Sequence, residues 1–247
     1  MNGKVIGLIP ARMGSSRFYG KPIVNIYNKP MLYWVYDQAK KAKDLKEIYV
    51  VTPDLEILNK CKEFDIPCIY DKRQGSTAAQ KLAFSIDKLD GDIYLNIQGD
   101  EPLLNPLAIT QIINELQANK DSYYVGLISN IKNESEHNDR NVVKAVVNVN
   151  NEAMYFSRTP IPEKFEYGNA FRVLGLYGYR KWFLELFAQI DKSKLELLES
   201  GVEMLRMLEL GYKIKLLKTK YETIGVDLRE HIPLIEKEIK KRKVLKQ

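Results

Sequence analysis

Short apolar runs alternate with amphipathic stretches through the first half of this 247-residue chain, and this alternation constrains the fold more than any other feature. Each apolar run has the length of a buried strand, and each amphipathic stretch has apolar residues at helical spacing. The predicted strands are residues 4–9, 47–52, 66–70 and 92–97, and the predicted helices are residues 30–42, 54–64, 78–89 and 106–119. Strands that alternate with helices form βαβ units, so the sequence predicts an α/β fold with a doubly wound, mainly parallel sheet.

The second half of the chain has a different pattern. Its predicted elements are antiparallel strands at residues 142–149, 152–157 and 173–179, a long helix at 194–210, a strand at 212–217 and a closing helix at 229–241. Asn150-Asn151 is the predicted turn between the first two strands, and Asp54 is the predicted N-cap of the helix at 54–64. No low-complexity linker separates the halves. We predict a single domain over residues 1–247, with a β-rich insertion at about residues 130–185.

Composition and charge narrow the class of protein. The chain is 45% hydrophobic and 28% charged, which is typical of a globular domain. No apolar run is long enough to cross a membrane and the start has no signal-peptide pattern, so we expect a cytoplasmic protein without a membrane partner. Cys61 and Cys68 lack metal-type spacing and are predicted to be reduced thiols. The net charge of +6 suits a polyanionic ligand, but no nucleic-acid-binding motif is present, so we expect a small anionic substrate and no nucleic acid.

A basic, glycine-containing loop follows the first predicted strand. Its cations and glycines are Arg12, Arg17, Lys21, Gly14 and Gly20. Ligands of open α/β sheets bind beyond the carboxyl ends of the strands, which is where this loop begins. The glycines let backbone N–H groups approach an anion, and the cations add positive charge. Because the spacing is neither that of a Walker A loop nor that of G-x-G-x-x-G, the loop predicts a phosphate site of another type.

Carboxylates follow two other predicted strands. Asp100 comes directly after the strand at 92–97, and Asp227 follows the strand at 212–217. A carboxylate at a strand end that faces a cationic loop suits a Mg²⁺ ion bridging substrate phosphates. Taken alone, Asp227 is explained as the N-cap of the last helix; paired with Asp100, it is a candidate second ligand for the metal.

Together these residues resemble a known family. The run from Pro10 to Pro22 is similar to the P-A-R-x-x-S-x-R-L-P-G-K-P start of the CMP-KDO synthetases, the 3-deoxy-manno-octulosonate cytidylyltransferases. The further matches, in the family's order, are Gln98 to Pro102, Asn141 to Lys144, Phe156 to Arg158, Gly175 to Arg180 and Gly225 to Asp227. These matches cover nearly the whole chain, which makes the resemblance specific.

The resemblance implies a cytidylyltransferase of Rossmann-like nucleotidyltransferase fold. Such an enzyme transfers CMP from CTP to the anomeric hydroxyl of an acidic sugar, releases pyrophosphate and so supplies surface-glycan synthesis, in lipopolysaccharide or capsule. It also implies Mg²⁺ as cofactor and a homodimer formed through the β-rich insertion. The implied catalytic residues are Arg12, Lys21 and Asp100, and the implied metal ligands are Asp100 and Asp227. The implied nucleotide-binding residues are Pro10, Ala11, Arg12, Arg17, Lys21, Thr77, Lys81 and Gln98. The implied acceptor-binding residues are Arg158, Tyr177, Tyr179 and Glu203.

The sequence departs from the family pattern where the base and the acceptor are expected. Residues 75–81 replace the family's H-x-S-G-T-D/E-R, Val173 stands at the family's His position, and Met204 replaces the Gln of E-Q-L-R. An imidazole and an amide that read sugar hydroxyls are therefore lost, and we predict that KDO itself is not the best acceptor. We expect a KDO-like acid with a different tail, such as 8-amino-KDO, a nonulosonic acid or a phosphonate-type acid.

Two other classes of function fit parts of the sequence. The altered segment at 75–81 is compatible with a non-catalytic nucleotide-binding relative, whereas the retained cations and aspartates favour an enzyme. A glycosyltransferase of similar build would need a D-x-D-like motif, which Gly99-Asp100-Glu101 does not provide. His137 and His231 lie outside every motif and are predicted to be surface residues, so a carboxylate or a metal-activated hydroxyl is the expected source of base catalysis.

Overall fold

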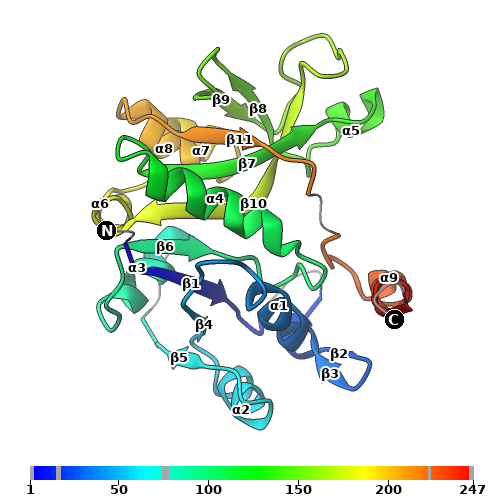
Figure 1. Ribbon diagram of the computed structural model, residues 1–247. Helices are drawn as coiled ribbons and strands as arrows, with labels where there is room; N and C mark the ends of the chain where they lie inside the picture. Colours follow the sequence, from blue (N-terminus) through cyan, green and yellow to red (C-terminus); the bar gives the residue numbers. More distant parts are fainter. Residues whose placement is uncertain (1–2, 15–17, 74–77, 222–223, 245–247) are drawn as a thin grey trace.

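A mixed β-sheet crosses the centre of the computed structural model, which describes residues 3–14, 18–73, 78–221 and 224–244 (Figure 1). Its main strands are β1 (Val5–Pro10), β4 (Glu47–Thr52), β5 (Cys68–Tyr70), β6 (Ile93–Asn96), β7 (Tyr124–Asn130), β10 (Phe171–Arg180) and β11 (Lys215–Lys218). They lie in the order β11-β7-β10-β6-β1-β4-β5. The strands are rich in buried apolar residues, as strands covered on both faces require.

Strand direction determines where a ligand site can form. β1 pairs in parallel with β4 and β6, and β7 pairs in parallel with β11. β10 is antiparallel to both β6 and β7, so β7 runs in the same direction as β6. The carboxyl ends of β1, β4, β6, β7 and β11 therefore share one edge of the sheet, and the predicted fold class is confirmed.

Helices cover both faces of the sheet (Figure 1). The helices that pack on one face are α1 (Met31–Ala39), α2 (Leu55–Glu63) and α4 (Pro106–Ala118). Those on the other face are α3 (Ala78–Ile86), α6 (Lys181–Gln189) and α8 (Met204–Glu209). Apolar side chains from these helices and from the strands form the two halves of the core.

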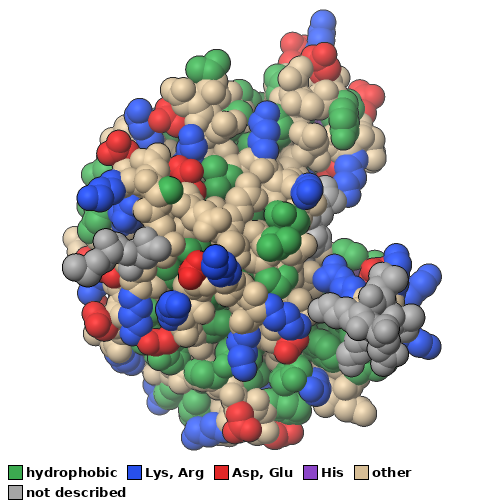
Figure 2. Space-filling view, in the orientation of Figure 1, with side chains coloured by type: hydrophobic (Ala, Val, Ile, Leu, Met, Phe, Trp, Pro, Cys, Tyr) green, Lys and Arg blue, Asp and Glu red, His purple; other side chains and the backbone are tan. Residues whose placement is uncertain are grey.

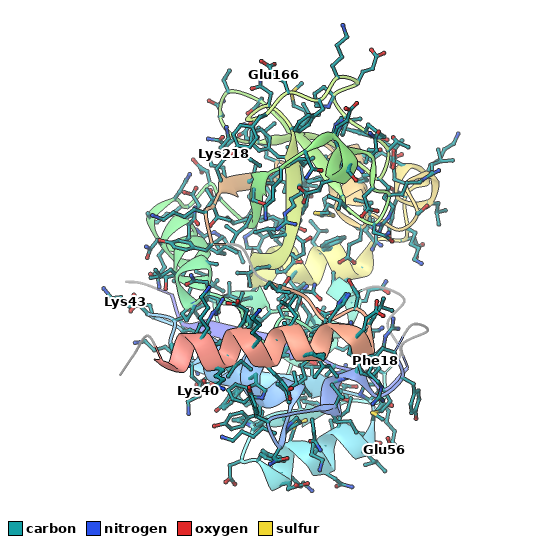
Figure 3. The ribbon with its side chains drawn as sticks, turned by 90° about the vertical axis from the view of Figure 1, so that its right-hand side faces the viewer. Phe18, Lys40, Lys43, Glu56, Glu166 and Lys218 are labelled. Carbon is teal, nitrogen blue, oxygen red and sulfur yellow. The ribbon has the colours of Figure 1, made fainter. Side chains whose placement is uncertain are left out.

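A third apolar cluster connects the early loop to the last helix, α9 (Ile232–Val244). Phe18 and Trp34 pack there with Ile235 and Ile239 of α9. Figure 3 shows α9 lying across the lower part of the molecule, with Phe18 close to one of its ends. The short elements near this cluster are η1 (Lys21–Ile23), β2 (Asn25–Ile26), β3 (Lys29–Pro30) and η2 (Arg229–His231).

The β-rich segment projects from the main sheet. A hairpin of β8 (Lys144–Val147) and β9 (Ala153–Ser157) pairs through β8 with β10, and α5 (Glu134–Asn138) lies beside it (Figure 1). The predicted turn is confirmed: the Asn148 side-chain oxygen accepts hydrogen bonds from the N–H groups of Asn150 and Glu152, and Asn151 has a φ of 57°. The role of residues 130–185 as a dimerisation segment stays a prediction.

One predicted helix is wrong. Residues 194–210 form two short helices, α7 (Lys194–Leu198) and α8, and not one long helix. The break lies at Ser200 and Gly201, whose φ angles of 54° and 81° are left-handed. The N–H of Gly201 donates to the carbonyl of Glu196, which ends α7. β7 and α6 were not predicted from the sequence.

Two local predictions also need correction. Asp54 stands at the N-cap position of α2, but its carboxylate makes no cap hydrogen bond and accepts one from the N–H of Met13. His137 is buried, with 2% of its surface exposed, and its ring lies against that of Phe165 with centroids 5.7 Å apart.

No helix in the described part of the chain is long and apolar enough to span a membrane.

Candidate active site

The structure brings together one cation and two carboxylates that the sequence singled out. Lys21 Nζ lies 2.7 Å from Asp100 Oδ2 and 3.9 Å from Asp227 Oδ1. Lys21 begins η1, Asp100 follows β6, and Asp227 lies between β11 and η2, so three distant parts of the chain meet here. The Lys21 side chain is 13% exposed and that of Asp227 48%, so the group is open to solvent from the aspartate side.

The loop that carries Arg12 is anchored directly after that residue, at Met13. The N–H of Met13 donates to Asp54 Oδ2 at 2.7 Å, and the N–H of Gly20 donates to the carbonyl of Met13 at 3.0 Å. Gly20 has a φ of 69°, which a residue with a side chain adopts only with strain. Met13 and Phe18 are buried, whereas Arg12 is exposed. The apolar anchors thus hold the loop while it presents its arginine to solvent.

The ends of β1 and β6 lie side by side, close to Asp100. A Cβ on Gly99 would stand 3.0 Å from the carbonyl oxygen of Pro10, and Ala11 is buried directly after it. Gln98 packs against β10, because a Cβ on Gly175 would lie 2.6 Å from Gln98 Cγ. Two glycines therefore give the strand ends the close approach that this part of the site requires.

Asp227 is held by its neighbours in the chain and by the turn after β6. The N–H of Val226, a buried residue, donates to the carbonyl of Asp100 at 2.9 Å. The N–H of Asp227 donates to Nδ1 of His231 at 3.1 Å. His231 is thus more than the isolated surface residue expected from the sequence, since its ring orients the backbone of a candidate metal ligand.

A second group of predicted residues lies on the face of the sheet covered by α3 and α8. Lys81, on α3, is half-buried, and its pKa is lowered by burial and by the positive charge of Arg12. The carboxylate of Glu203, at the start of α8, acts in the opposite direction on the same pKa. Lys81 is therefore within electrostatic range of Arg12, predicted on the nucleotide side, and of Glu203, predicted on the acceptor side.

The two predicted tyrosines differ in accessibility. Tyr177 is half-buried, whereas Tyr179 is fully buried and stacks on Tyr124 with ring centroids 4.8 Å apart. Burial, followed by the charge of Glu203, raises the pKa of both Tyr177 and Tyr179 well above the usual range. Tyr177 has surface to offer a ligand, and Tyr179 forms a layer beneath it.

Glu101 was not predicted from the sequence as a functional residue. Burial and the neighbouring charge of Asp100 raise its pKa to about 8, while the charge of Arg172 opposes that shift. Glu101 therefore holds a proton more readily than an ordinary glutamate does.

Arg158 follows β9 on the projecting hairpin. Its guanidinium donates to the carbonyl of Arg140 at 3.2 Å. Val173, on β10, is half-buried, and Met204, on α8, is buried, so the two substituted positions are apolar and packed. Arg17 and Thr77 lie outside the described residues.

Figure 2 shows a hollow in the molecular surface between the upper part of the molecule and α9. In Figure 1 the carboxyl end of β1 points toward this side. The hollow is therefore on the edge of the sheet where ligands of this fold class bind.

Comparisons with known proteins agree with this geometry. The profile of the family described as "Cytidylyltransferase" matches residues 6–218. An 8-amino-3,8-dideoxy-manno-octulosonate cytidylyltransferase of Shewanella pealeana is 37% identical over 236 residues, covering 93% of this chain and 96% of the relative. A 3-deoxy-manno-octulosonate cytidylyltransferase of Thermodesulfovibrio yellowstonii is 37% identical over 248 residues, covering 94% of this chain and 96% of the relative.

A solved structure gives the same result. CMP:2-keto-3-deoxy-manno-octonic acid synthetase complexed with CTP matches with a TM-score of 0.89 at 31% identity, covering 97% of this chain and 99% of that chain. The resemblance to the CMP-KDO synthetases is confirmed. The chain belongs to the cytidylyltransferase family and is a nucleotidyltransferase.

Proposed function

We propose that this enzyme transfers CMP from CTP to the anomeric hydroxyl of a KDO-like acidic sugar and releases pyrophosphate, so that the product feeds the synthesis of lipopolysaccharide or capsule. The observation that carries the proposal is the meeting of Lys21 with Asp100 and Asp227 at the carboxyl edge of the sheet. A cation beside two carboxylates suits a triphosphate that binds as its metal complex.

Mg²⁺ fits the residues at this position. Both aspartates lie within 4 Å of the same ammonium group, so a cation between them is already accommodated. Across the described residues, His, Cys, Asp and Glu form no group of three or more that could hold a metal by themselves. Mg²⁺ commonly binds through one or two carboxylates together with substrate phosphates, which is the donor set available here.

The proposed chemistry is an in-line displacement at the α-phosphorus. The acceptor oxygen forms the new bond to the α-phosphorus and gives its hydroxyl proton to a nearby carboxylate or to water. The bond from the α-phosphorus to the bridging oxygen breaks, and its electron pair leaves with pyrophosphate. Arg12 and Lys21 stabilise the negative charge that develops on the phosphate oxygens, with Arg17 beside them. When bound, Mg²⁺ would supply further charge neutralisation on the same oxygens. Pro10, Ala11, Gln98 and Lys81 position the nucleotide, and Thr77 is proposed to assist.

The acceptor is proposed to bind between Arg158, Tyr177 and Glu203, with Tyr179 behind. Two acids are candidates, because relatives of both specificities are equally similar. The packed, apolar Val173 and Met204 favour an acid other than KDO, since they cannot hydrogen-bond a sugar hydroxyl. Glu203 would suit an ammonium group, as 8-amino-KDO carries.

We further propose that the enzyme is cytoplasmic and acts as a homodimer formed through residues 130–185. The β8–β9 hairpin supports the second proposal, since Val149 and Met154 are 97% and 62% exposed although Ala145 and Phe156 of the same hairpin belong to the core. Sedimentation analysis of the enzyme against a variant that lacks the tip of this hairpin tests the dimer.

A pyrophosphate-release screen tests the reaction. Four nucleoside triphosphates are crossed with KDO, 8-amino-KDO, a nonulosonic acid and a phosphonate in the presence of Mg²⁺. We expect release with CTP and an acidic sugar, and faster turnover with an acid other than KDO. Nucleotide binding without pyrophosphate release from any combination would favour a non-catalytic relative.

A further inference from the structure

The ammonium group of Lys144 is buried at the base of the projecting hairpin. The residue has 0% of its surface exposed, and Nζ donates to the carbonyls of Asp139 at 2.7 Å, Val142 at 3.0 Å and Arg158 at 2.7 Å. Burial lowers its pKa from the usual value. Because a buried ammonium is costly unless its donors are satisfied, these carbonyls are held tightly in place.

The carboxylate of Glu199 holds the same stretch of chain from another side. It accepts hydrogen bonds from the hydroxyl of Ser157 at 3.0 Å, from the N–H of Arg158 at 3.1 Å and from the hydroxyl of Tyr155 at 3.4 Å. Arg158 therefore has both its N–H and its carbonyl bound by charged side chains. We call Lys144 and Glu199, with these bonds to Arg158, the Arg158 clamp.

The clamp connects the elements that carry the proposed acceptor residues. Lys144 pairs with Arg172 across β8 and β10, and the N–H of Val173 donates to the carbonyl of Val143 at 2.8 Å. Glu199 lies in the turn between α7 and α8, four residues before Glu203. A change in either charged group would thus shift Arg158 relative to β10 and to Glu203.

We propose that Lys144 and Glu199 are positioning residues for the acidic acceptor: they fix the backbone of Arg158, so that its guanidinium meets the acceptor carboxylate, and they have no part in nucleotide binding. The inference rests on the proposed function, in which Arg158 binds the acid. A guanidinium binds a carboxylate through two parallel hydrogen bonds, and this geometry tolerates little displacement.

Two variants, Lys144→Met and Glu199→Gln, test the proposal by steady-state kinetics with CTP and the best acid. We expect the KM for the acid to rise about tenfold or more in each variant, because displacements of about 1 Å have effects of this size or larger. The KM for CTP should change less than about twofold. Thermal unfolding of each variant is measured alongside. Glu199→Gln keeps the volume and one acceptor oxygen, so it serves if Lys144→Met does not fold.

Matched controls come from the opposite end of the same hairpin. Lys215 Nζ donates to the carbonyl of Asn150 at 2.6 Å, and Glu152 accepts from the Asn148 side chain at 2.9 Å. Lys215→Met and Glu152→Gln alter hydrogen bonds of the same chemical kind at more exposed positions, and both KM values should stay unchanged.

Different results would contradict the proposed function and the positioning role of Lys144 and Glu199. Wild-type enzyme that releases no pyrophosphate with any acid contradicts the proposed function. Active wild type together with a folded Glu199→Gln variant whose KM for the acid is unchanged contradicts the positioning role. Equal increases in the KM for CTP and for the acid would also overturn it, because the effect would then not be specific to the acceptor.

Discussion

Lys21 Nζ lies 2.7 Å from Asp100 Oδ2, at the carboxyl end of strand β6. Asp92 stands just before the other end of that strand, where its carboxylate accepts a hydrogen bond from the N–H of Lys4 at 2.7 Å. We predict that Asp100→Asn lowers kcat about 100-fold or more, since a charge-stabilising group is lost. Asp92→Asn should leave kcat unchanged. Pyrophosphate release at saturating Mg²⁺ and CTP measures kcat of both variants. Comparable rates for wild type and Asp100→Asn would contradict the proposed role of Asp100 in catalysis.

The same ion pair has a consequence for metal binding. The Lys21 ammonium lies beside both carboxylates, so it competes with a divalent cation for them. We predict that Lys21→Met binds Mn²⁺ several-fold more tightly than wild type without nucleotide, even as its activity falls. Calorimetric titration with Mn²⁺ measures the affinity. Lys60→Met, which breaks an exposed 2.6 Å ion pair with Glu63, is the control. Unchanged or weaker binding to Lys21→Met would contradict this prediction.

Two glycines of β10 provide a matched pair of substitutions. A Cβ on Gly175 would lie 2.6 Å from Gln98 Cγ, whereas one on Gly178 would lie 2.5 Å from Ile112 Cγ2 in the core under α4. Gly175→Ala should displace Gln98 and raise a substrate KM with a small change in melting temperature. Gly178→Ala should destabilise the fold by about 1 to 3 kcal/mol through overpacking. Kinetics and thermal unfolding of both variants separate these outcomes, and a Gly175→Ala enzyme with wild-type constants would count against a role for Gln98.

Acceptor selectivity should respond to the two apolar substitutions. We predict that Val173→His combined with Met204→Gln shifts the ratio of kcat/KM for KDO over 8-amino-KDO toward KDO by about tenfold or more, because hydrogen-bonding groups for a hydroxyl are restored. Competition between the two acids in one reaction, with products separated by chromatography, measures this ratio directly. An unchanged ratio in a folded double variant would show that selectivity lies elsewhere.

The Asp71 carboxylate should make stability depend on acid pH. Its side chain is 8% exposed and lies 2.6 Å from Arg73 Nη2, and the hydrogen bonds from Arg73 hold its pKa well below the usual 3.8. Since the folded state binds this proton less readily than the unfolded state, the stabilisation is present above about pH 4 and is lost as pH falls.

Asp71→Asn tests this dependence. The variant should lose about 1 to 2 kcal/mol of unfolding free energy at pH 7, a modest amount because Arg73 is 44% exposed. The difference from wild type should shrink as pH falls from 5 to 3. Urea unfolding at several pH values gives both quantities, and a difference independent of pH would contradict the expected loss of stabilisation in acid.

Local sequence patterns were enough to predict the parts of the site that lie at strand ends. Asp100 and the loop with Lys21 follow strongly apolar runs, and parallel strands bring such ends to one edge. Hydrogen bonds between residues far apart in the sequence could not be predicted from local sequence patterns. The Asp54 side chain follows the N-cap rule in the sequence, yet it binds Met13, 41 residues away, because that N–H lies within its reach only in the folded chain.

The missed elements have physical reasons as well. Gly126 lies inside β7 and weakens its strand pattern, and the strand is defined by its pairing with β10 and β11. In α6 the buried residues Phe183, Leu184 and Phe187 do have helical spacing, so that signal was present but obscured by aromatic residues that also suit strands. Gly201 was the available sign that the helix predicted at 194–210 is interrupted.

The hydrogen bond from Val226 to the carbonyl of Asp100 has a consequence for the order in which activity arises during translation. Lys21 and Asp227 are separated by more than 200 residues. When the early loop and the turn after β6 have emerged from the ribosome, the segment that contains Asp227 has not yet been synthesised. A nascent chain therefore contains Arg12 and Lys21 long before it contains both aspartates, and premature termination anywhere upstream of Val226 yields a product without Asp227.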